Sequence, residues 1–144
     1  ERVRMIEIVL AGPPMGKQRV RLSKATGTVY TPARTVAYEG RLAYAAQEAM
    51  RGADPLGGPL LVDMLVYVAV PASKPKRWVA EALAGAIRPV KKPDADNFAK
   101  MLDALNQVVW IDDSQIVDLR VQKHYSNQPR MVIRVGPINE GLFG

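Results

Sequence analysis

Two aspartates one residue apart, followed by a lysine at helical distance, form the densest chemically competent group in the sequence. Asp94 and Asp96 come directly after Pro93, and Lys100 lies four residues beyond Asp96. Proline biases the residue before it toward extended backbone, so the chain is expected to reach Asp94 outside a helix. Alternate residues of extended backbone project to the same side, which would place both carboxylates together. Adjacent carboxylates repel each other unless a cation lies between them.

Carboxylate oxygens of this kind predict a magnesium site. Mg²⁺ takes one or two protein carboxylates together with phosphate oxygens of its substrate. A metal held there could activate water and stabilise charge on a phosphodiester under in-line attack. Asp96 is predicted as the N-cap of a helix that begins at Asn97, and Lys100, one turn later, could contact the scissile phosphate.

A second acidic pair, Asp112 and Asp113, follows the apolar run 108–111. At least one of these side chains must face a cleft or solvent, and Asp113 could complete a three-carboxylate site if the chain folds back. The alternative is structural: aspartates often cap helices, and Lys100 with Asp103 could form a simple surface ion pair. A calcium loop is disfavoured because the required glycine and late glutamate are absent from the register.

The elements that must position these residues alternate between helix and strand. Hydrophobic periodicity predicts a loose basic hairpin over 16–31, helices over 35–50, 76–84 and 97–105, and strands over 5–10, 60–70, 116–125 and 131–135. This order predicts an α/β (α+β) two-layer single domain over 1–144, a mixed sheet with helices packed on one face, and a frayed tail at about 137–144.

Three local predictions can be checked against the structure. The first helix is expected to share a face made of Val36, Leu42, Ala43, Ala46 and Met50. Ser73 is expected to cap the second helix, with its Trp78 and Leu83 facing inward. The turn at 127–129 is expected to return the chain as a final antiparallel strand.

Composition favours a polyanion as partner. The net charge is +6, the pI is about 9.8, and there is no cysteine for a disulfide or thiolate metal site. No apolar run is long enough for a membrane-spanning helix, and the first residues show no signal-peptide pattern, so we expect a cytoplasmic protein. Basic residues in two segments are the expected phosphate contacts, although a solvated charged surface is the alternative: Lys17, Arg19 and Arg21, and Lys91 and Lys92.

The same motifs resemble a known family. The run Lys-Pro-Asp-Ala-Asp-Asn-Phe-Ala-Lys at 92–100, then Asp-Ala-Leu at 103–105 and Trp-Ile-Asp-Asp-Ser-Gln-Ile at 110–116, is similar to the signature of the RusA family of Holliday junction resolvases. The resemblance covers about residues 93–121, and the segments 14–21 and 30–32 look like the phage-type branch. One departure is Asn106-Gln107, where a glycine-containing turn is often seen.

The resemblance implies a small α/β homodimer that binds four-way DNA junctions and makes paired nicks with Mg²⁺, or Mn²⁺ as a substitute, in DNA recombination and repair. It assigns Asp94, Asp96 and Asp113 to the metal and Lys100 to the phosphate, with Asp112 and Asp103 as supporting positions. Two alternatives stay open at this point. One is a non-catalytic DNA-binding module of the same fold, and the other is a branched or flap DNA nuclease without junction preference.

Overall fold

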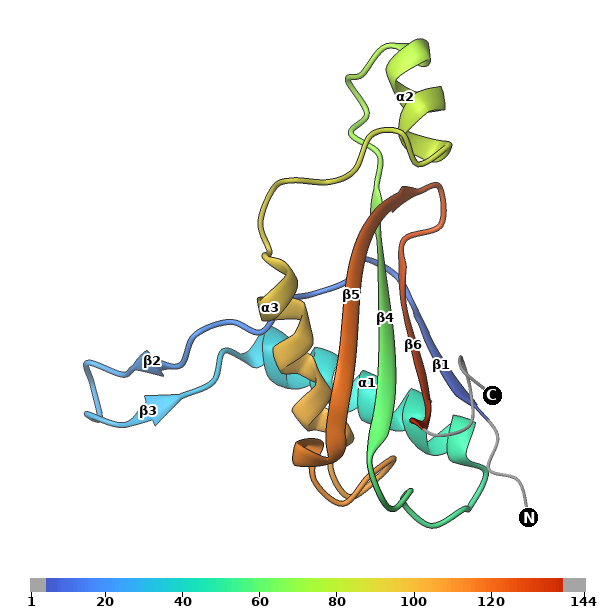
Figure 1. Ribbon diagram of the computed structural model, residues 1–144. Coiled ribbons are helices and arrows are strands. Elements are labelled where there is room, and N and C mark those ends of the chain that lie inside the picture. Colours follow the sequence, from blue (N-terminus) through green and yellow to red (C-terminus); the bar gives the residue numbers. More distant parts are fainter. Residues whose placement is uncertain (1–4, 139–144) are drawn as a thin grey trace.

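The computed structural model describes residues 5–138 and is built around a four-stranded mixed sheet (Figure 1). The predicted α+β class is confirmed. The strand order is β1-β6-β4-β5, with β4 parallel to β5 and β6 antiparallel to both β1 and β4. The strands are β1 (Ile6–Ala11), β4 (Leu60–Ala69), β5 (Ile116–Ser126) and β6 (Arg130–Pro137).

The turn at 127–129 returns the chain as a final antiparallel strand, as predicted, but this strand does not pair with the one before it. β6 lies between β1 and β4, whereas β5 pairs with β4 alone and forms an edge of the sheet. Composition explains this arrangement, because β6 buries Met131, Val132, Ile133 and Val135 and suits the interior of a sheet. The strand β5 carries the charged side chains Asp118, Arg120 and Lys123, which suit a sheet edge.

Helix α1 (Ala33–Met50) crosses one face of the sheet and packs its buried residues into the core (Figure 1). Its buried residues are Thr35, Tyr38, Leu42, Ala46 and Met50. The predicted face was therefore partly wrong, since Val36 is 54% exposed. Two residues correspond to about 200° of rotation on a helix, so Val36 and the buried Tyr38 lie on opposite sides.

The sheet face toward α1 is apolar, and the acidic segment packs on it beside the helix. Val62, Met64 and Val66 of β4 join the core, and the core also contains Phe98 and the fully buried Trp110. The chain from Asp94 to Gln115 forms three short helical segments: α3 (Ala95–Ala99), the 3-10 helix η1 (Lys100–Leu105) and the 3-10 turn η2 (Asp113–Gln115).

Two projections leave this body (Figure 1). The first is the predicted hairpin, formed by β2 (Arg21–Leu22) and β3 (Val29–Tyr30). The second carries α2 (Lys76–Leu83) beyond the end of the sheet, so this helix does not cover the sheet face.

The details predicted for α2 were wrong in two respects. Pro75, not Ser73, precedes the helix, and no side chain caps it. Leu83 is 39% exposed, because α2 stands away from the core, while Trp78 is half-buried against Tyr125 of β5. Of the predicted frayed tail, Pro137 ends β6 and the amide of Ile138 donates to the Pro59 carbonyl, whereas 139–144 lie outside the described residues.

Candidate nuclease site

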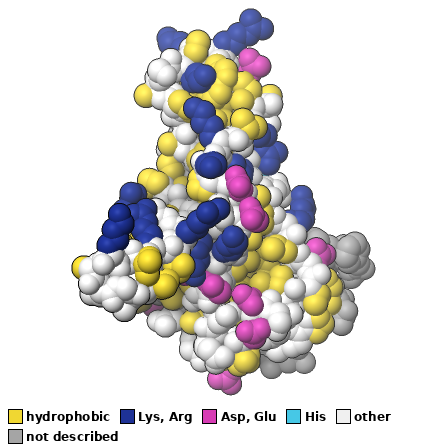
Figure 2. Space-filling view, turned by 90° about the vertical axis from the view of Figure 1, so that its left-hand side faces the viewer, with side chains coloured by type: hydrophobic (Ala, Val, Ile, Leu, Met, Phe, Trp, Pro, Cys, Tyr) yellow, Lys and Arg dark blue, Asp and Glu magenta, His cyan; other side chains and the backbone are white. Residues whose placement is uncertain are grey.

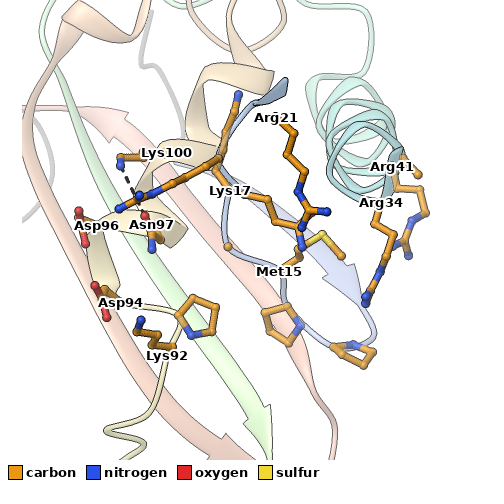
Figure 3. Close-up of a pocket in the computed structure, with 17 residues that line it drawn as sticks. Met15, Lys17, Arg21, Arg34, Arg41, Lys92, Asp94, Asp96, Asn97 and Lys100 are labelled. Atoms are coloured by element: carbon orange, nitrogen blue, oxygen red, sulfur yellow. Dashed lines mark hydrogen bonds between the residues drawn. The ribbon is translucent and has the colours of Figure 1, made fainter. Parts of the chain in front are cut away.

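An open cleft of about 1280 Å³ lies between the loop after β1, the start of α1 and the segment that leads into α3 (Figure 3). Seven cationic side chains and two carboxylates line it. The cations are Lys17, Arg19, Arg21, Arg34, Arg41, Lys92 and Lys100, and the carboxylates are Asp94 and Asp96. In Figure 3 the two carboxylates lie on one side of the cleft, and Arg34 and Arg41 project from α1 on the other.

The loop after β1 is fixed against the acidic segment by close backbone contact. The amide of Lys17 donates to the Asn97 carbonyl at 2.9 Å. Gly16 is buried there, and a Cβ atom at this position would lie only 2.7 Å from Cβ of Pro93. The sequence thus requires glycine at 16, because any side chain would meet a rigid ring one residue before Asp94.

Lys17 crosslinks three elements of the cleft. Its Nζ lies 2.8 Å from Oε2 of Glu39 on α1 and 3.2 Å from Oδ2 of Asp103 on η1. Burial opposes the charged form, yet the hydrogen bonds and charges of these two carboxylates raise the pKa of Lys17 above its ordinary value. The predicted supporting residue Asp103 therefore acts here through Lys17, and the alternative pair of Lys100 with Asp103 is not the one observed.

Asp94 and Asp96 are brought together, although by a different local structure from the predicted one. Asp94, not Asp96, occupies the N-cap position, in extended backbone, and Asp96 lies in the first turn of α3. The Asp94 carboxylate makes no capping hydrogen bond, and both aspartates are exposed. Figure 3 shows the two carboxylates side by side and turned the same way, so their oxygens are free to bind a cation.

Lys100 lies where the sequence predicted, one turn after Asp96. Its amide donates to the Asp96 carbonyl, and its Nζ lies 3.5 Å from Oδ1 of Asn97 (Figure 3). Asn97, which the sequence reading did not assign, therefore lies between the acidic pair and the lysine. Its motif position beside Asp96 was the available signal.

The second acidic pair lies at the other end of the helical segment. The Asp112 carboxylate caps η2 by accepting from the Ser114 amide at 3.0 Å. Hydrogen bonds with the side chain and then the backbone of Ser114 hold the pKa of Asp112 below its usual value. Asp113 lines a separate hollow with Leu102 and Leu119. Within residues 5–138 no three acidic, histidine or cysteine side chains come together as a metal site. The cleft thus unites Asp94, Asp96 and Lys100, whereas Asp113 lines the separate hollow.

The donor set at Asp94 and Asp96 fits a hard divalent cation. Two exposed carboxylates, with the remaining positions left to water and phosphate, are what Mg²⁺ commonly uses. The surrounding cations give the cleft a positive field that attracts polyanions, and Figure 2 shows basic side chains gathered around acidic ones on this face.

Other predicted basic residues divide between the cleft and its surroundings. Arg19, Arg21 and Lys92 line the cleft, whereas Lys91 lines a neighbouring small crevice and accepts a hydrogen bond from Lys123 through its carbonyl. Arg34 and Arg41 were missed. Their spacing of seven residues, which places them on one side of a helix, was the usable signal.

Within residues 5–138, the structure offers no helix with the length and hydrophobicity needed to traverse a lipid bilayer.

The sequence of this chain matches a known family and a known relative. Residues 11–136 match the family model described as endodeoxyribonuclease RusA. The chain is also 34% identical over 139 residues to the uncharacterized protein YqaN of Bacillus subtilis, an alignment that covers 93% of this chain and 97% of the relative. The family match spans the cleft, both acidic pairs and both projections.

Proposed function

The chain belongs to the RusA family of endodeoxyribonucleases, and from this premise we propose that it is a magnesium-dependent enzyme that resolves four-way DNA junctions by paired nicks. Its role would lie in DNA recombination and repair in the cytoplasm. One observation carries the proposal: the free carboxylates of Asp94 and Asp96 lie side by side at the edge of a cleft lined by seven cations.

Each group of the cleft has a separate task in this mechanism. Asp94 and Asp96 would hold the divalent ion, Mg²⁺ or Mn²⁺, which when bound supplies Lewis acidity and an activated water. Lys100 would contact the scissile phosphate, with its ammonium group oriented by Asn97. Arg21, with the other arginines across the cleft, would bind flanking phosphates and position the strand.

The third ligand remains a prediction from the family resemblance. That resemblance assigns Asp113 to the metal, and the hollow that Asp113 lines is distinct from the cleft. We therefore propose Asp94 and Asp96 as the principal ligands and Asp113 as a further one. A lower magnesium affinity of Asp113→Asn, measured by calorimetry, would support its assignment.

A homodimer is part of the proposal. Paired nicks on two strands of a junction require two active sites related by symmetry, and a two-fold dimer supplies them.

Replacing Asp96 with Asn tests the proposal directly. The variant keeps the shape of the side chain but removes a metal-binding charge, so cleavage should fall by at least ~10²-fold while junction binding persists. Cleavage of a four-way junction, a flap and a linear duplex is compared with and without Mg²⁺. Asp54→Asn, an exposed aspartate in the turn after α1, is the matched control and should cleave normally.

The same assay separates the alternatives. A non-catalytic DNA-binding module would show no magnesium-dependent cleavage in the unmodified protein. Equal cleavage of flap and junction would assign a branched-DNA nuclease without junction preference. Undiminished nicking by Asp96→Asn would refute the assignment of the site.

A further inference from the structure

The projection that carries α2 is strongly basic, and the proposed mechanism does not use it. We call residues 71–92 the α2 arm. Between Met64 and Pro93 the sequence holds one acidic residue, Glu81, and six cations: Lys74, Lys76, Arg77, Arg88, Lys91 and Lys92. Of these six residues, Lys92 lines the cleft, so the charge of the arm extends the positive surface away from the acidic pair.

The outer cations of the arm have few competing contacts. Arg77 is 95% exposed and reaches Glu81 only at 3.9 Å, a surface pair of little energetic weight. The Lys74 ammonium group lies 4.9 Å from the Trp78 ring centre, which leaves its donors free. Lys76 is exposed, and no ion pair is recorded for it within residues 5–138. These side chains are available to an anionic partner.

The arm is held in place by contacts with the edge strand β5. Trp78 packs edge-on against Tyr125, with ring centres 5.4 Å apart. Nε of Arg88 donates to the Lys123 carbonyl at 2.6 Å, and Nζ of Lys123 donates to the Lys91 carbonyl at 2.8 Å. The position of the arm relative to the neighbouring Asp94 is thus fixed by contacts of α2 itself and of the segment that follows it.

The shape of the molecule separates the arm from the cleft. Figures 1 and 2 show the arm standing beyond the end of the sheet, while the hairpin flanks the acidic segment from another direction. A single straight duplex seated in the cleft follows one path across this surface. A second duplex that leaves a branch point at an angle could follow another path, along the arm.

We propose that the α2 arm is a second site for the DNA backbone, an inference that rests on the proposed function. It would contact one duplex of a branched DNA while the cleft holds another. Exposed lysine and arginine side chains recognise phosphate, and such contacts are independent of sequence. The one carboxylate on the arm, that of Glu81, makes only the weak surface pair with Arg77. Because a linear duplex would not reach both sites at once, the arm contributes selectivity for branched substrates.

The test compares binding of a four-way junction and of a linear duplex of equal length, without divalent metal so that cleavage plays no part. The variant Lys76→Gln/Arg77→Gln should weaken junction binding by roughly tenfold and duplex binding by less than about twofold. For the junction, the slope of log Kd against log salt concentration should fall by about two, one for each lost phosphate contact. The matched control Arg51→Gln/Arg120→Gln removes two exposed charges that lie neither on the arm nor in the cleft.

Every outcome is decisive. Equal losses for junction and duplex overturn the branch-specific role, and unchanged junction binding overturns any DNA contact by the arm. A junction preference that is present in the unmodified chain and persists in the arm variant overturns this inference alone. Absence of any preference in the unmodified chain overturns the proposed junction substrate and the role of the arm together.

Discussion

At the scale of single residues, Lys17 and Arg21 line the same cleft but differ in whether their charge is already neutralised by carboxylates. Lys17 is paired with Glu39 and Asp103, and no ion pair is recorded for Arg21 within residues 5–138. Both were predicted to contact phosphate, because both belong to one basic run of the sequence. The structure separates them, since a lysine already neutralised by two carboxylates releases few counterions when DNA binds.

Substituting each residue should therefore have a different effect. Arg21→Gln should lower the slope of log Kd for DNA against log salt concentration by about one and leave the melting temperature unchanged. Lys17→Gln should leave the slope nearly unchanged and lower the melting temperature, because Glu39 and Asp103 lose the cation between them. Fluorescence anisotropy over a salt series and thermal unfolding measure the two effects. An equal loss of slope in both variants would contradict the structural role of Lys17.

At the scale of elements, Gly16 joins the loop after β1 to the segment before α3. An alanine Cβ would lie 2.7 Å from Cβ and 3.0 Å from Cγ of Pro93, and a proline ring cannot rotate away. Gly16→Ala should therefore destabilise the fold by about 1–3 kcal/mol, or several degrees in melting temperature. Cleavage should fall as well, because Pro93 directly precedes Asp94.

The control for this prediction lies in α1. A Cβ at Gly40 meets nothing within 4 Å, so Gly40→Ala should raise stability by about 0.5–1 kcal/mol through helix propensity alone. Thermal unfolding and junction cleavage are measured for both variants. If Gly16→Ala melts and cleaves like the unmodified chain, the loop is not fixed by this contact.

Local patterns predicted which elements form but not how they assemble. The order of helices and strands was confirmed, because each apolar run carries its own periodicity. The position of β6 between β1 and β4 was not predictable, since strand pairing depends on contacts between segments distant in sequence. The predicted buried face of α1 was also wrong at Val36. A valine and a tyrosine two residues apart compete for the same core, and the larger Tyr38 is the one that is buried.

In the candidate site too, local spacing was predictable and the way the segment folds onto the core was not. The motif spacing was sufficient to pair Asp94 with Asp96 and to place Lys100 one turn later. It could not predict that the helix tightens to 3-10 geometry from Lys100, or that Gln107 adopts a φ of 69° where the family resemblance led us to expect glycine. These features depend on how the segment closes onto Trp110, whose carbonyl accepts from the Gln107 amide.

At the scale of the whole molecule, the proposed activity requires two sites acting on one junction. The described chain presents one acidic pair in its cleft, so paired nicks would require a second copy of the chain on the same DNA. If the copies form a two-fold dimer, their nicks occur within the lifetime of one complex. If they act as separate monomers, the nicks are independent events.

Mixed dimers distinguish these cases. Unmodified and Asp96→Asn chains are co-expressed in equal amounts and given a supercoiled plasmid that extrudes a cruciform. Random pairing leaves about a quarter of dimers with two working sites and about half with one, so nicked circles should accumulate and linear product should fall to about a quarter. Separate monomers would instead show the same ratio of linear to nicked product as an equal concentration of unmodified chain alone. Because the Asp96→Asn chain retains DNA binding, the excess of nicked circles over the unmodified chain alone would come from junctions held by one working and one inactive site.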